Sequence, residues 1–337
     1  MPRKAPAFWQ SRSLKSLLLM PLSALFGALA AARRLLFRLG ICRAVRLPVP
    51  VIVVGNIAVG GSGKTPVVEW LVQRLREAGY TPGIVSRGYG GTVDGIALVP
   101  GDGDPARFGD EPVLLARVAR CPVAVGADRP AAAQALLEAC PDCDVIVSDD
   151  GLQHYRLARD VEVVVVDERT LGNRRLLPAG PLREPVSRLR GVDLVVAHGE
   201  VSPDLARCLA SKPVFPMTLE GDAFVALGGS GKHCAADSFR TRRVHAVAGI
   251  GRPERFFTQL TAMGLDVIPH PFPDHHHFTA SDLDFAPGEA KILTSKDAVK
   301  CAAFAPADTW EFPVTARIAA GAAEHILEKL THGRQTA

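Results

Sequence analysis

A glycine-rich stretch followed by lysine and threonine has the residue types that most clearly predict chemistry. Gly60, Gly61 and Gly63 allow the backbone to approach a ligand closely, and Lys64 and Thr65 follow directly. In such a loop the backbone N–H groups hold phosphate oxygens, the lysine reaches the β- and γ-phosphates, and the hydroxyl binds Mg²⁺. The pattern predicts an ATP- or GTP-binding segment that comprises Ala58, Val59, Gly60, Gly61, Ser62, Gly63, Lys64 and Thr65.

The segment departs from the strict phosphate-loop pattern at its first position, where Ala58 replaces glycine. An apolar run at 51–54 precedes it and an amphipathic run follows it, as a strand, loop and helix require; a chance glycine-rich turn is the alternative. A second copy, GGSGKHC at 228–234, has His233 in place of the hydroxyl residue and no helical pattern after it. We interpret this second copy as a β-turn between short strands.

Two aspartates end another apolar run, in VIVSDDG at 145–151. Asp149 and Asp150 stand where a phosphate-loop enzyme places a carboxylate that holds Mg²⁺, although a simple turn with Gly151 is an alternative. The [NT]-K-x-D pattern that recognises guanine is missing, because in TSKDAV at 294–299 Asp297 directly follows Lys296. The sequence therefore favours ATP over GTP.

The elements that must position these residues alternate between short apolar runs and helical patterns. Near-continuous Val/Ile runs indicate strands buried on both faces, which predicts an α/β fold with a doubly wound, mainly parallel sheet. Ligands are expected beyond the carboxyl ends of its strands. The predicted strands are 49–54, 82–86, 122–125, 145–148, 161–166 and 192–197, and the predicted helices are 65–78, 110–119, 129–139 and 184–190.

The pattern changes after about residue 212. Extended segments at 213–219 and 224–227 lead to a second, smaller α/β set, with strands predicted at 244–248, 265–268 and 291–293 and helices at 253–263, 296–303 and 323–330. We therefore expect three parts: a basic and apolar N-terminal segment at 1–46, a phosphate-loop domain at 47–220, and a smaller α/β domain at 221–337.

The N-terminal segment combines an uncharged run at 16–32 with nine basic residues and no acidic residue in positions 1–46. A secretory signal, a membrane-spanning helix, a buried core helix and a helix lying in the membrane interface are all compatible with an apolar run. Basic residues flank this run on both sides, which removes the charge difference that orients a spanning helix and suits contact with anionic headgroups. We favour the interfacial helix, with the spanning helix second.

Composition excludes several classes of protein. The 337 residues are 47% hydrophobic and 22% charged, which is typical of a globular protein and not of a disordered one. A net charge of +4 without an arginine-aromatic module does not indicate a nucleic-acid partner. Seven cysteines without regular spacing indicate a reducing compartment, and the Cys140–Cys143 pair precedes a strand, unlike a redox motif.

Seven segments stand in order along nearly the whole chain: VGNIAVGGSGKTP, SRGYGG, GDEP, DDGLQH, LPAGPLREP, FPDHHHF and TSKDAVK. Each alone is weak, but taken together and in order they resemble the tetraacyldisaccharide 4′-kinase family of lipid A biosynthesis, whose phosphate loop also lacks the first glycine. The resemblance implies transfer of the ATP γ-phosphate to the 4′-hydroxyl of a lipid A disaccharide 1-phosphate precursor, giving lipid IVA, with Mg²⁺, on the cytoplasmic face of the bacterial inner membrane.

The resemblance also implies roles for single residues. It pairs Asp110 with His275 as the catalytic group that accepts the hydroxyl proton, with His276 as the second choice. N-capping is the alternative for Asp110, and a metal cluster or solvated loop residues are the alternatives for the histidines. Glu111 is a further candidate ligand of Mg²⁺ or water. The candidates for acceptor or phosphate contacts are Arg87, Tyr89, Arg129, Gln153, His154, Arg183 and Glu184.

Because the base and the phosphate loop are expected on different domains, we expect the domains to close when both substrates bind. Two other functions remain open on the sequence. One is a phosphate-loop ATPase or GTPase switch or chaperone without a small-molecule acceptor, and the other is a soluble kinase whose N-terminus packs on its core.

Overall fold

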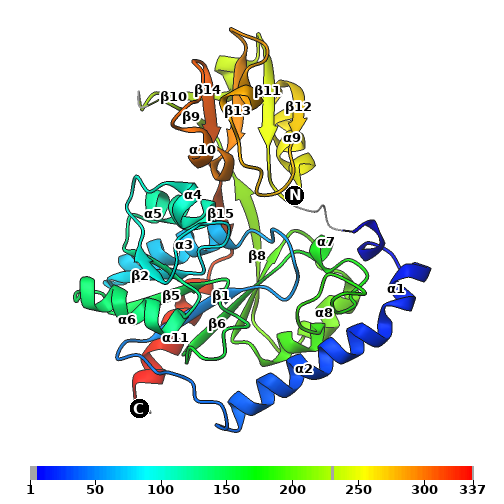
Figure 1. The fold of residues 1–337 in the computed structure, drawn as a ribbon, viewed down its shortest axis with the longest axis vertical. Coiled ribbons are helices and arrows are strands. Elements are labelled where there is room, and N and C mark those ends of the chain that lie inside the picture. Colours follow the sequence, from blue (N-terminus) through cyan, green and yellow to red (C-terminus); the bar gives the residue numbers. More distant parts are fainter. Residues whose placement is uncertain (1–5, 229–230, 336–337) are drawn as a thin grey trace.

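The computed structural model describes residues 6–228 and 231–335, which form two lobes joined by two strands (Figure 1). The larger lobe is built on a nine-stranded sheet and the smaller lobe on a six-stranded sheet. The strands β8 and β15 lead from the larger lobe towards the smaller one (Figure 1). The doubly wound, mainly parallel α/β fold expected from the sequence is confirmed.

The larger sheet is parallel except at its two edges, where β15 and β3 run antiparallel to their neighbours. Its central strand, β1, lies between β5 and β6, and the order of strands therefore reverses beside it. Such a switch point opens a crevice at the carboxyl ends of the strands. In sheet order the strands are β15 (Thr315–Ile318), β8 (Val214–Glu220), β7 (Leu194–His198), β6 (Val161–Val166), β1 (Val51–Gly55), β5 (Val145–Asp149), β2 (Pro82–Ser86), β4 (Val123–Gly126) and β3 (Ile96–Leu98).

Helices cover both faces of this sheet, because apolar side chains of the inner strands point to both. One face packs against α3 (Lys64–Glu77), α5 (Asp110–Ala119) and α11 (Ala322–Gln335). The other packs against α6 (Arg129–Ala139) and α8 (Pro203–Leu209). Two short helices, α4 (Pro105–Phe108) and α7 (Glu168–Leu171), lie in connections.

The smaller lobe has its own core, in which Phe224, Phe239, Trp310 and Phe312 pack ring against ring. β9 and β10 pair antiparallel and flank the second glycine-lysine copy, as expected for a turn between short strands. Residues 229 and 230 of that copy lie outside the described part of the chain. The strands in order are β10 (His233–Ala235), β9 (Ala223–Ala226), β14 (Thr309–Phe312), β13 (Ala290–Thr294), β11 (Arg243–Ala248) and β12 (Asp266–Pro271), with α9 (Pro253–Ala262) and α10 (Ser295–Cys301).

Two features differ from the sequence expectation. The end of the expected 221–337 domain returns to the larger lobe, because β15 pairs with β8 and α11 buries Ile326 and Leu330 in the core of that lobe. The helix expected at 184–190 is a 3₁₀ helix that begins two residues later, Val186–Gly191, because Pro185 is extended. The other 3₁₀ helices are Ala7–Trp9, Ala236–Phe239 and Ala280–Leu283.

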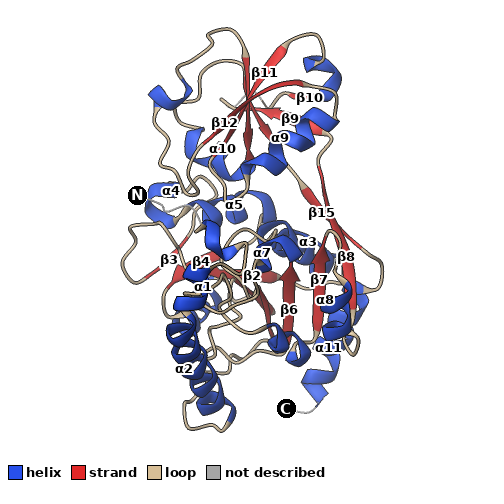
Figure 2. Ribbon diagram, turned by 90° about the vertical axis from the view of Figure 1, so that its right-hand side faces the viewer, coloured by secondary structure: helices blue, strands red, loops and turns tan. Residues whose placement is uncertain are grey.

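The N-terminal segment forms α1 (Leu14–Leu18) and α2 (Met20–Arg38), and α2 lies on the outside of the larger lobe, remote from the smaller lobe (Figures 1 and 2). Hydrogen bonds fix it there: Ser16 Oγ donates to the Ala179 carbonyl at 2.6 Å and Ser23 Oγ donates to the Leu176 carbonyl at 2.8 Å. By length and composition α2 is able to cross a membrane, and almost none of it is buried. The alternative of a buried core helix is therefore wrong.

Candidate functional site

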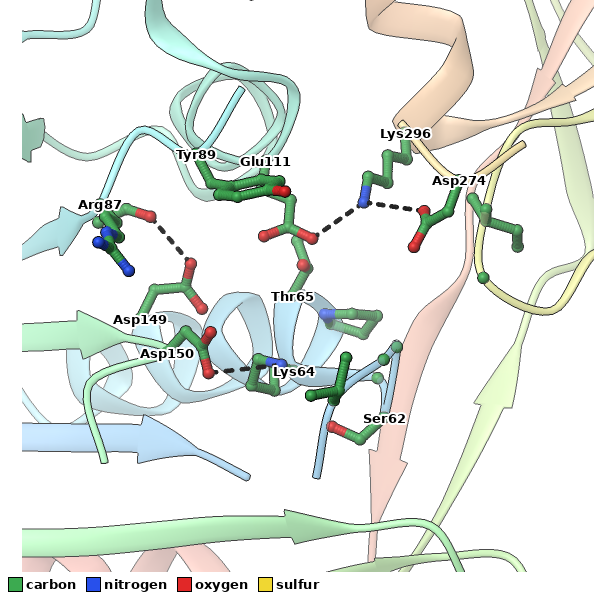
Figure 3. A pocket seen from close by; sticks show the side chains of 18 of the residues that line it. Ser62, Lys64, Thr65, Arg87, Tyr89, Glu111, Asp149, Asp150, Asp274 and Lys296 are labelled. Atoms are coloured by element: carbon green, nitrogen blue, oxygen red, sulfur yellow. Dashed lines mark hydrogen bonds and ion pairs between the residues drawn. The ribbon is translucent and has the colours of Figure 1, made fainter. Parts of the chain in front are cut away.

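A cavity of about 1200 Å³ lies at the carboxyl end of β1 and is lined by residues of both lobes. Side chains from both lobes point into it (Figure 3). It brings together every site residue expected from the sequence except Ala58 and Asp110, which lie just behind its wall. From the larger lobe these are Val59, Gly60, Gly61, Ser62, Gly63, Lys64, Thr65, Arg87, Tyr89, Glu111, Arg129, Asp149, Asp150, Gln153, His154, Arg183 and Glu184, and from the smaller lobe His275.

The glycine-rich loop connects β1 to α3. Gly60 and Gly63 have φ angles of 114° and 88°, a conformation that favours glycine over other residues. The loop is tied by Asn56, whose Nδ2 donates to Ser62 Oγ at 3.1 Å and to the Gly60 carbonyl at 3.3 Å. Ala58 is almost fully buried and forms a backbone bridge with Leu182. Its methyl group therefore packs inside the lobe, where a glycine is not required.

Lys64 and Asp150 face each other across this loop, with Nζ 3.6 Å from Oδ1 (Figure 3). Asp150 also accepts from Arg183 Nη1 at 3.0 Å. Burial alone would raise the pKa of Asp150, but Lys64 and Arg183 outweigh it and lower that pKa to about 2. Asp150 is therefore a charged carboxylate that holds the side chains of Lys64 and Arg183 beside the loop.

Asp149 is in a different electrostatic environment. It is buried, and its Oδ2 accepts a hydrogen bond from Ser86 Oγ at 3.1 Å. Burial, and then the nearby carboxylates of Glu111 and Asp150, raise the pKa of Asp149 to about 6. A cation bound at this point would relieve both causes, so Asp149 is the carboxylate of the predicted set best suited to a metal ion.

Among the described residues no three His, Cys, Asp or Glu side chains converge on one metal position. Glu111 instead forms an ion pair with Lys296, at 3.1 Å between Oε1 and Nζ (Figure 3). This arrangement still fits Mg²⁺, which is commonly held by one or two carboxylates together with substrate phosphates and water. Asp149 and the Thr65 hydroxyl are oxygen donors of the required kind, and both line the cavity.

Asp110 and His275 meet across the two lobes, with Oδ2 3.1 Å from Nδ1. His275 has a φ of 58°, a strained conformation for a residue with a side chain. The hydrogen bond to Asp110 raises the pKa of His275. Burial would raise the pKa of Asp110, but His275 and Lys296 outweigh it and lower that pKa to about 2. The N-cap residue of α5 is Gly109 and not Asp110.

The next two histidines of the FPDHHHF segment do not line the cavity. The Nε2 of His276 lies 3.3 Å from Asp282 Oδ2 within the smaller lobe, and His277 is exposed. The geometry therefore favours His275 over His276 as the partner of Asp110.

Lys296 is the main residue of this site that the motif analysis did not assign. Its Nζ lies 3.3 Å from His275 Nε2 and 3.7 Å from a carboxylate oxygen of both Asp110 and Asp274. A lysine ammonium only donates, so a hydrogen bond to Nε2 leaves the imidazole proton on Nδ1, facing Asp110. The sequence signal that could have identified Lys296 is the TSKDAVK segment, which forms the start of α10.

The wall beside the start of the loop is a network of side chains that includes residues of the DDGLQH and LREP segments, and Gln153 Nε2 donates to the Asn56 carbonyl at 3.1 Å. Glu184 accepts from Gln153 Nε2 at 2.9 Å and from the Tyr155 hydroxyl at 2.7 Å. Arg129 is fully buried, its Nη1 donates to the Val85 carbonyl at 2.7 Å, and burial lowers its pKa to about 10. Burial, and then Arg129, lower the pKa of His154 to about 4, which makes its imidazole neutral at pH 7. Glu184 and Arg129 thus position their neighbours.

The last wall is apolar and comes from the N-terminal segment. Phe26, Leu29, Ala30 and Arg33 of α2 line the same cavity as the phosphate loop. The sequence predicted the apolar run itself but did not predict that it reaches the site, because nothing in its pattern specifies which part of the larger lobe it contacts.

Comparisons with known proteins agree on one family. The family model described as tetraacyldisaccharide-1-P 4′-kinase matches residues 15–331. The chain is 75% identical to the tetraacyldisaccharide 4′-kinase of Aromatoleum aromaticum, with 100% of both chains covered, and 66% identical to that of an Azoarcus species, with 99% and 97% covered. It is similar to the crystal structure of LpxK from Aquifex aeolicus in complex with ATP, with 30% identity, a TM-score of 0.78, and 95% and 99% of the chains covered.

Proposed function

The chain belongs to the tetraacyldisaccharide-1-P 4′-kinase family, and on that premise we propose how its cavity performs the reaction. The γ-phosphate of ATP is transferred to the 4′-hydroxyl of tetraacyldisaccharide 1-phosphate, which forms lipid IVA in lipid A biosynthesis. The observation that carries this proposal is the shared cavity. A phosphate loop, the imidazole of a carboxylate–imidazole pair and an apolar helix face line one space, as transfer from a nucleotide to a lipid requires.

The nucleotide phosphates bind to the loop around Gly61, where backbone N–H groups, the start of α3 and Lys64 supply positive charge. The ATP complex of the Aquifex aeolicus protein supports this assignment. Asp149 and Thr65 would hold Mg²⁺, with Asp150 and Glu111 as the neighbouring acidic groups. A bound Mg²⁺ would neutralise the charge that develops on the phosphate oxygens.

Asp110 and His275 accept the proton of the acceptor hydroxyl. The bond from the 4′-oxygen to the γ-phosphorus forms, the bond from that phosphorus to the bridging oxygen breaks, and ADP leaves. The hydroxyl proton goes to the pair, whose carboxylate stabilises the imidazolium. Lys296 keeps the imidazole oriented through its contacts with His275 and Asp110.

The acceptor sugar lies beside this pair, where Gln153, Arg183, Tyr89 and Arg87 also line the cavity and offer polar contacts. Its acyl chains extend towards α2. The exposed leucines of α1 and α2 and the basic residues of the segment suit an enzyme held on the cytoplasmic face of the inner membrane.

The test is phosphoryl transfer by the purified protein in mixed micelles with Mg-ATP and disaccharide 1-phosphate. The proposal expects radiolabel to move from [γ-³²P]ATP to the lipid, with only slow release of inorganic phosphate in the absence of lipid. Nucleotide hydrolysis that is fast and indifferent to the lipid would overturn it in favour of a phosphate-loop switch or chaperone. Transfer of label to the lipid and release of inorganic phosphate are measured in the same reaction. The assay therefore distinguishes phosphoryl transfer from hydrolysis that is indifferent to the lipid.

A further inference from the structure

A second cleft, of about 610 Å³, lies at the carboxyl end of α2. It shares Tyr155 with the main cavity and is otherwise lined by different residues. Six of its lining residues are arginines and one is acidic, so its charge is strongly positive. We call it the arginine cleft; its charged residues are Arg34, Arg38, Arg46, Arg159, Arg188, Arg190 and Glu162.

The one carboxylate that lines the arginine cleft is already engaged. Glu162 accepts from Arg188 Nη2 at 2.6 and 2.7 Å and from Arg159 Nη1 at 3.2 Å. Arg188 is buried and also lies 3.3 Å from Glu184 Oε2. Glu162, Arg159 and Arg188 therefore form a fixed, nearly neutral set of ion pairs on the inner wall of the cleft. This set holds the cleft in shape.

The outer wall carries the uncompensated charge. In the part of the chain that the structure describes, neither Arg38 nor Arg190 has an ion pair or a side-chain hydrogen bond. Arg34 has only a long contact of 3.6 Å with Glu184, and Arg46 is paired with Asp160 at 2.9 Å. Arg34 and Arg38 are one helical turn apart on α2 and so face the cleft together. An anion that enters the cleft meets guanidinium groups from both of its sides.

Exposed apolar side chains lie directly beside these arginines along the chain. Leu35, Leu39 and Ile41 are 54%, 64% and 66% exposed. Phe37 adds an aromatic ring to the lining of the cleft itself. A soluble anion would gain nothing from these side chains, whereas an anion that carries acyl chains would bury them. The combination therefore selects an amphiphile.

We propose that the arginine cleft binds the phosphate of an anionic membrane phospholipid while the leucines beside it contact the acyl chains. The inference rests on the membrane docking stated under Proposed function and adds to it a defined headgroup site. It gives α2 a fixed point at its carboxyl end, so that the apolar wall of the main cavity faces the bilayer. Guanidinium groups suit this task because they bind phosphate oxygens in pairs.

The test compares sedimentation of the full-length protein with two kinds of vesicle, phosphatidylethanolamine with phosphatidylglycerol, and phosphatidylcholine alone. The variant is Arg38→Gln with Arg190→Gln, two residues outside the catalytic site. The control is Arg240→Gln with Arg243→Gln, which removes the same charge from the smaller lobe. Near-ultraviolet circular dichroism and transfer to the acceptor in detergent micelles report whether each protein is folded and active.

We expect the variant to bind phosphatidylglycerol vesicles about tenfold more weakly than the wild type at low salt, and the control to bind them normally. Binding to phosphatidylcholine should be equal for all three proteins, and added salt should shrink the difference. Equal binding of the variant and the control to both vesicles would overturn the proposal.

A raised KM for the acceptor in micelles, with unchanged vesicle binding, would also overturn it, because the cleft would then bind the 1-phosphate of the acceptor. Competition by sn-glycerol 3-phosphate for vesicle binding by the wild type would show that free phosphate esters enter the same site and would support it. Failure of the wild type to phosphorylate the acceptor would contradict the proposed function and leave the vesicle comparison valid.

Discussion

Asp110 has a pKa of about 2, so the isolated carboxylate is a weak base for a sugar hydroxyl. His275 has a raised pKa because its imidazolium form is stabilised by that carboxylate. In the proposed mechanism the imidazole therefore accepts the proton, and Asp110 holds the imidazole in place. Lys296 contributes by donating to the Nε2 lone pair of the imidazole, which leaves the imidazole proton on Nδ1 beside Asp110.

Replacing Asp110 by alanine should lower kcat by about 10²–10⁴, the range for loss of a positioned acid–base group. ATP affinity should change little, because the carboxylate lies behind the cavity wall and away from the phosphate loop. Steady-state kinetics and nucleotide titration measure the two quantities. His277→Ala is the matched control, since that histidine is exposed on the same segment. Intact turnover in the Asp110 variant would remove the pair from the mechanism.

Lys64→Ala should weaken nucleotide binding and turnover together, because Lys64 is the charged side chain of the loop itself. The chain contains its own control, Lys232→Ala, in the second glycine-lysine copy. That lysine lies over the Trp310 ring in the smaller lobe, 5.9 Å from its centroid. Isothermal titration with an ATP analogue should separate the two variants. Equal loss in both, or loss in Lys232→Ala alone, contradicts the assignment of the first copy.

His198 should make the stability of the protein depend on pH. Burial, and then the neighbouring Arg255, lower the pKa of His198 to about 4. In the unfolded chain this pKa is about 6.5, so between these values only the unfolded chain binds the proton. Stability is therefore fully present above about pH 6.5 and falls as pH decreases to about 4, by about 2–3 kcal/mol.

Urea unfolding across this pH interval measures the effect. His198→Asn should flatten the pH dependence relative to the wild type, whereas His277→Asn, at an exposed position, is the control. Asp149 acts in the opposite direction, since its pKa of about 6 makes the folded chain bind the extra proton. The difference between the unfolding free energies of the wild type and His198→Asn at each pH isolates the contribution of His198. Parallel curves for His198→Asn and the wild type would show that His198 carries no such effect.

The residues of the loop and the strand ends were predictable because their chemistry depends on local spacing. Gly60–Thr65 and Asp149–Asp150 each follow an apolar strand, and this order alone indicates a phosphate and metal site. The partnership of Asp110 with His275 spans 165 positions, and only the family resemblance suggested it. Lys296 was missed for the same reason, because a contact between two lobes leaves no spacing in the sequence.

At the scale of elements, α1 and α2 combine a fixed inner side with an exposed apolar side. Ser16 and Ser23 hold them by donating to the carbonyls of Ala179 and Leu176. Leu18, Leu22 and Leu25 recur at helical spacing and are 71%, 55% and 57% exposed. Such an uncovered stripe on a soluble surface is costly, and contact with acyl chains relieves the cost.

Leu22→Gln with Leu25→Gln should therefore reduce partitioning to phospholipid vesicles about tenfold or more, because each exchange removes a side chain that inserts below the headgroups. Ile96→Gln with Leu98→Gln is the matched control, since these residues are 41% and 43% exposed on β3. Vesicle sedimentation measures both. Unchanged partitioning of the first pair would favour a soluble kinase whose N-terminus only packs on the lobe.

Most strands and helices of the larger lobe were predicted within a few residues, since buried parallel strands are near-continuous Val/Ile runs. β1, for example, was expected at 49–54 and spans Val51–Gly55. The helix expected at 184–190 shows the limit of the method, because the pattern did not give its type or its start. Pro185 is extended and Arg188 bonds to Glu162 of β6, and the segment forms a 3₁₀ helix.

At the scale of the whole molecule, two connections join the lobes, β8 to β9 and β14 to β15. The two connections pass close together. A Cβ atom added to Gly221 in the first connection would lie only 2.6 Å from the carbonyl oxygen of Pro313 in the second. The return of the chain to the larger lobe was not foreseen, because β15 carries few apolar residues and follows β14 after only two positions.

Substrate binding should close the lobes about these two connections. His275 belongs to the smaller lobe and the phosphate loop to the larger one. Among the described residues, ion pairs such as Arg117–Glu311 at 2.6 Å and Arg255–Asp167 at 3.4 Å bridge the lobes, together with the packing of α10 on α5. A cavity of about 1200 Å³ must admit a lipid and then exclude water from phosphoryl transfer, and movement of one lobe accomplishes both.

Small-angle X-ray scattering should show a smaller radius of gyration with a non-hydrolysable Mg-ATP analogue and acceptor together than with either alone. The Lys64→Ala variant should show no such change at the same ligand concentrations, since it lacks the loop charge that holds the nucleotide under the moving lobe. An unchanged radius in the wild type at saturating ligands would mean that catalysis proceeds in the arrangement already present, with Asp110 and His275 preset at hydrogen-bond distance.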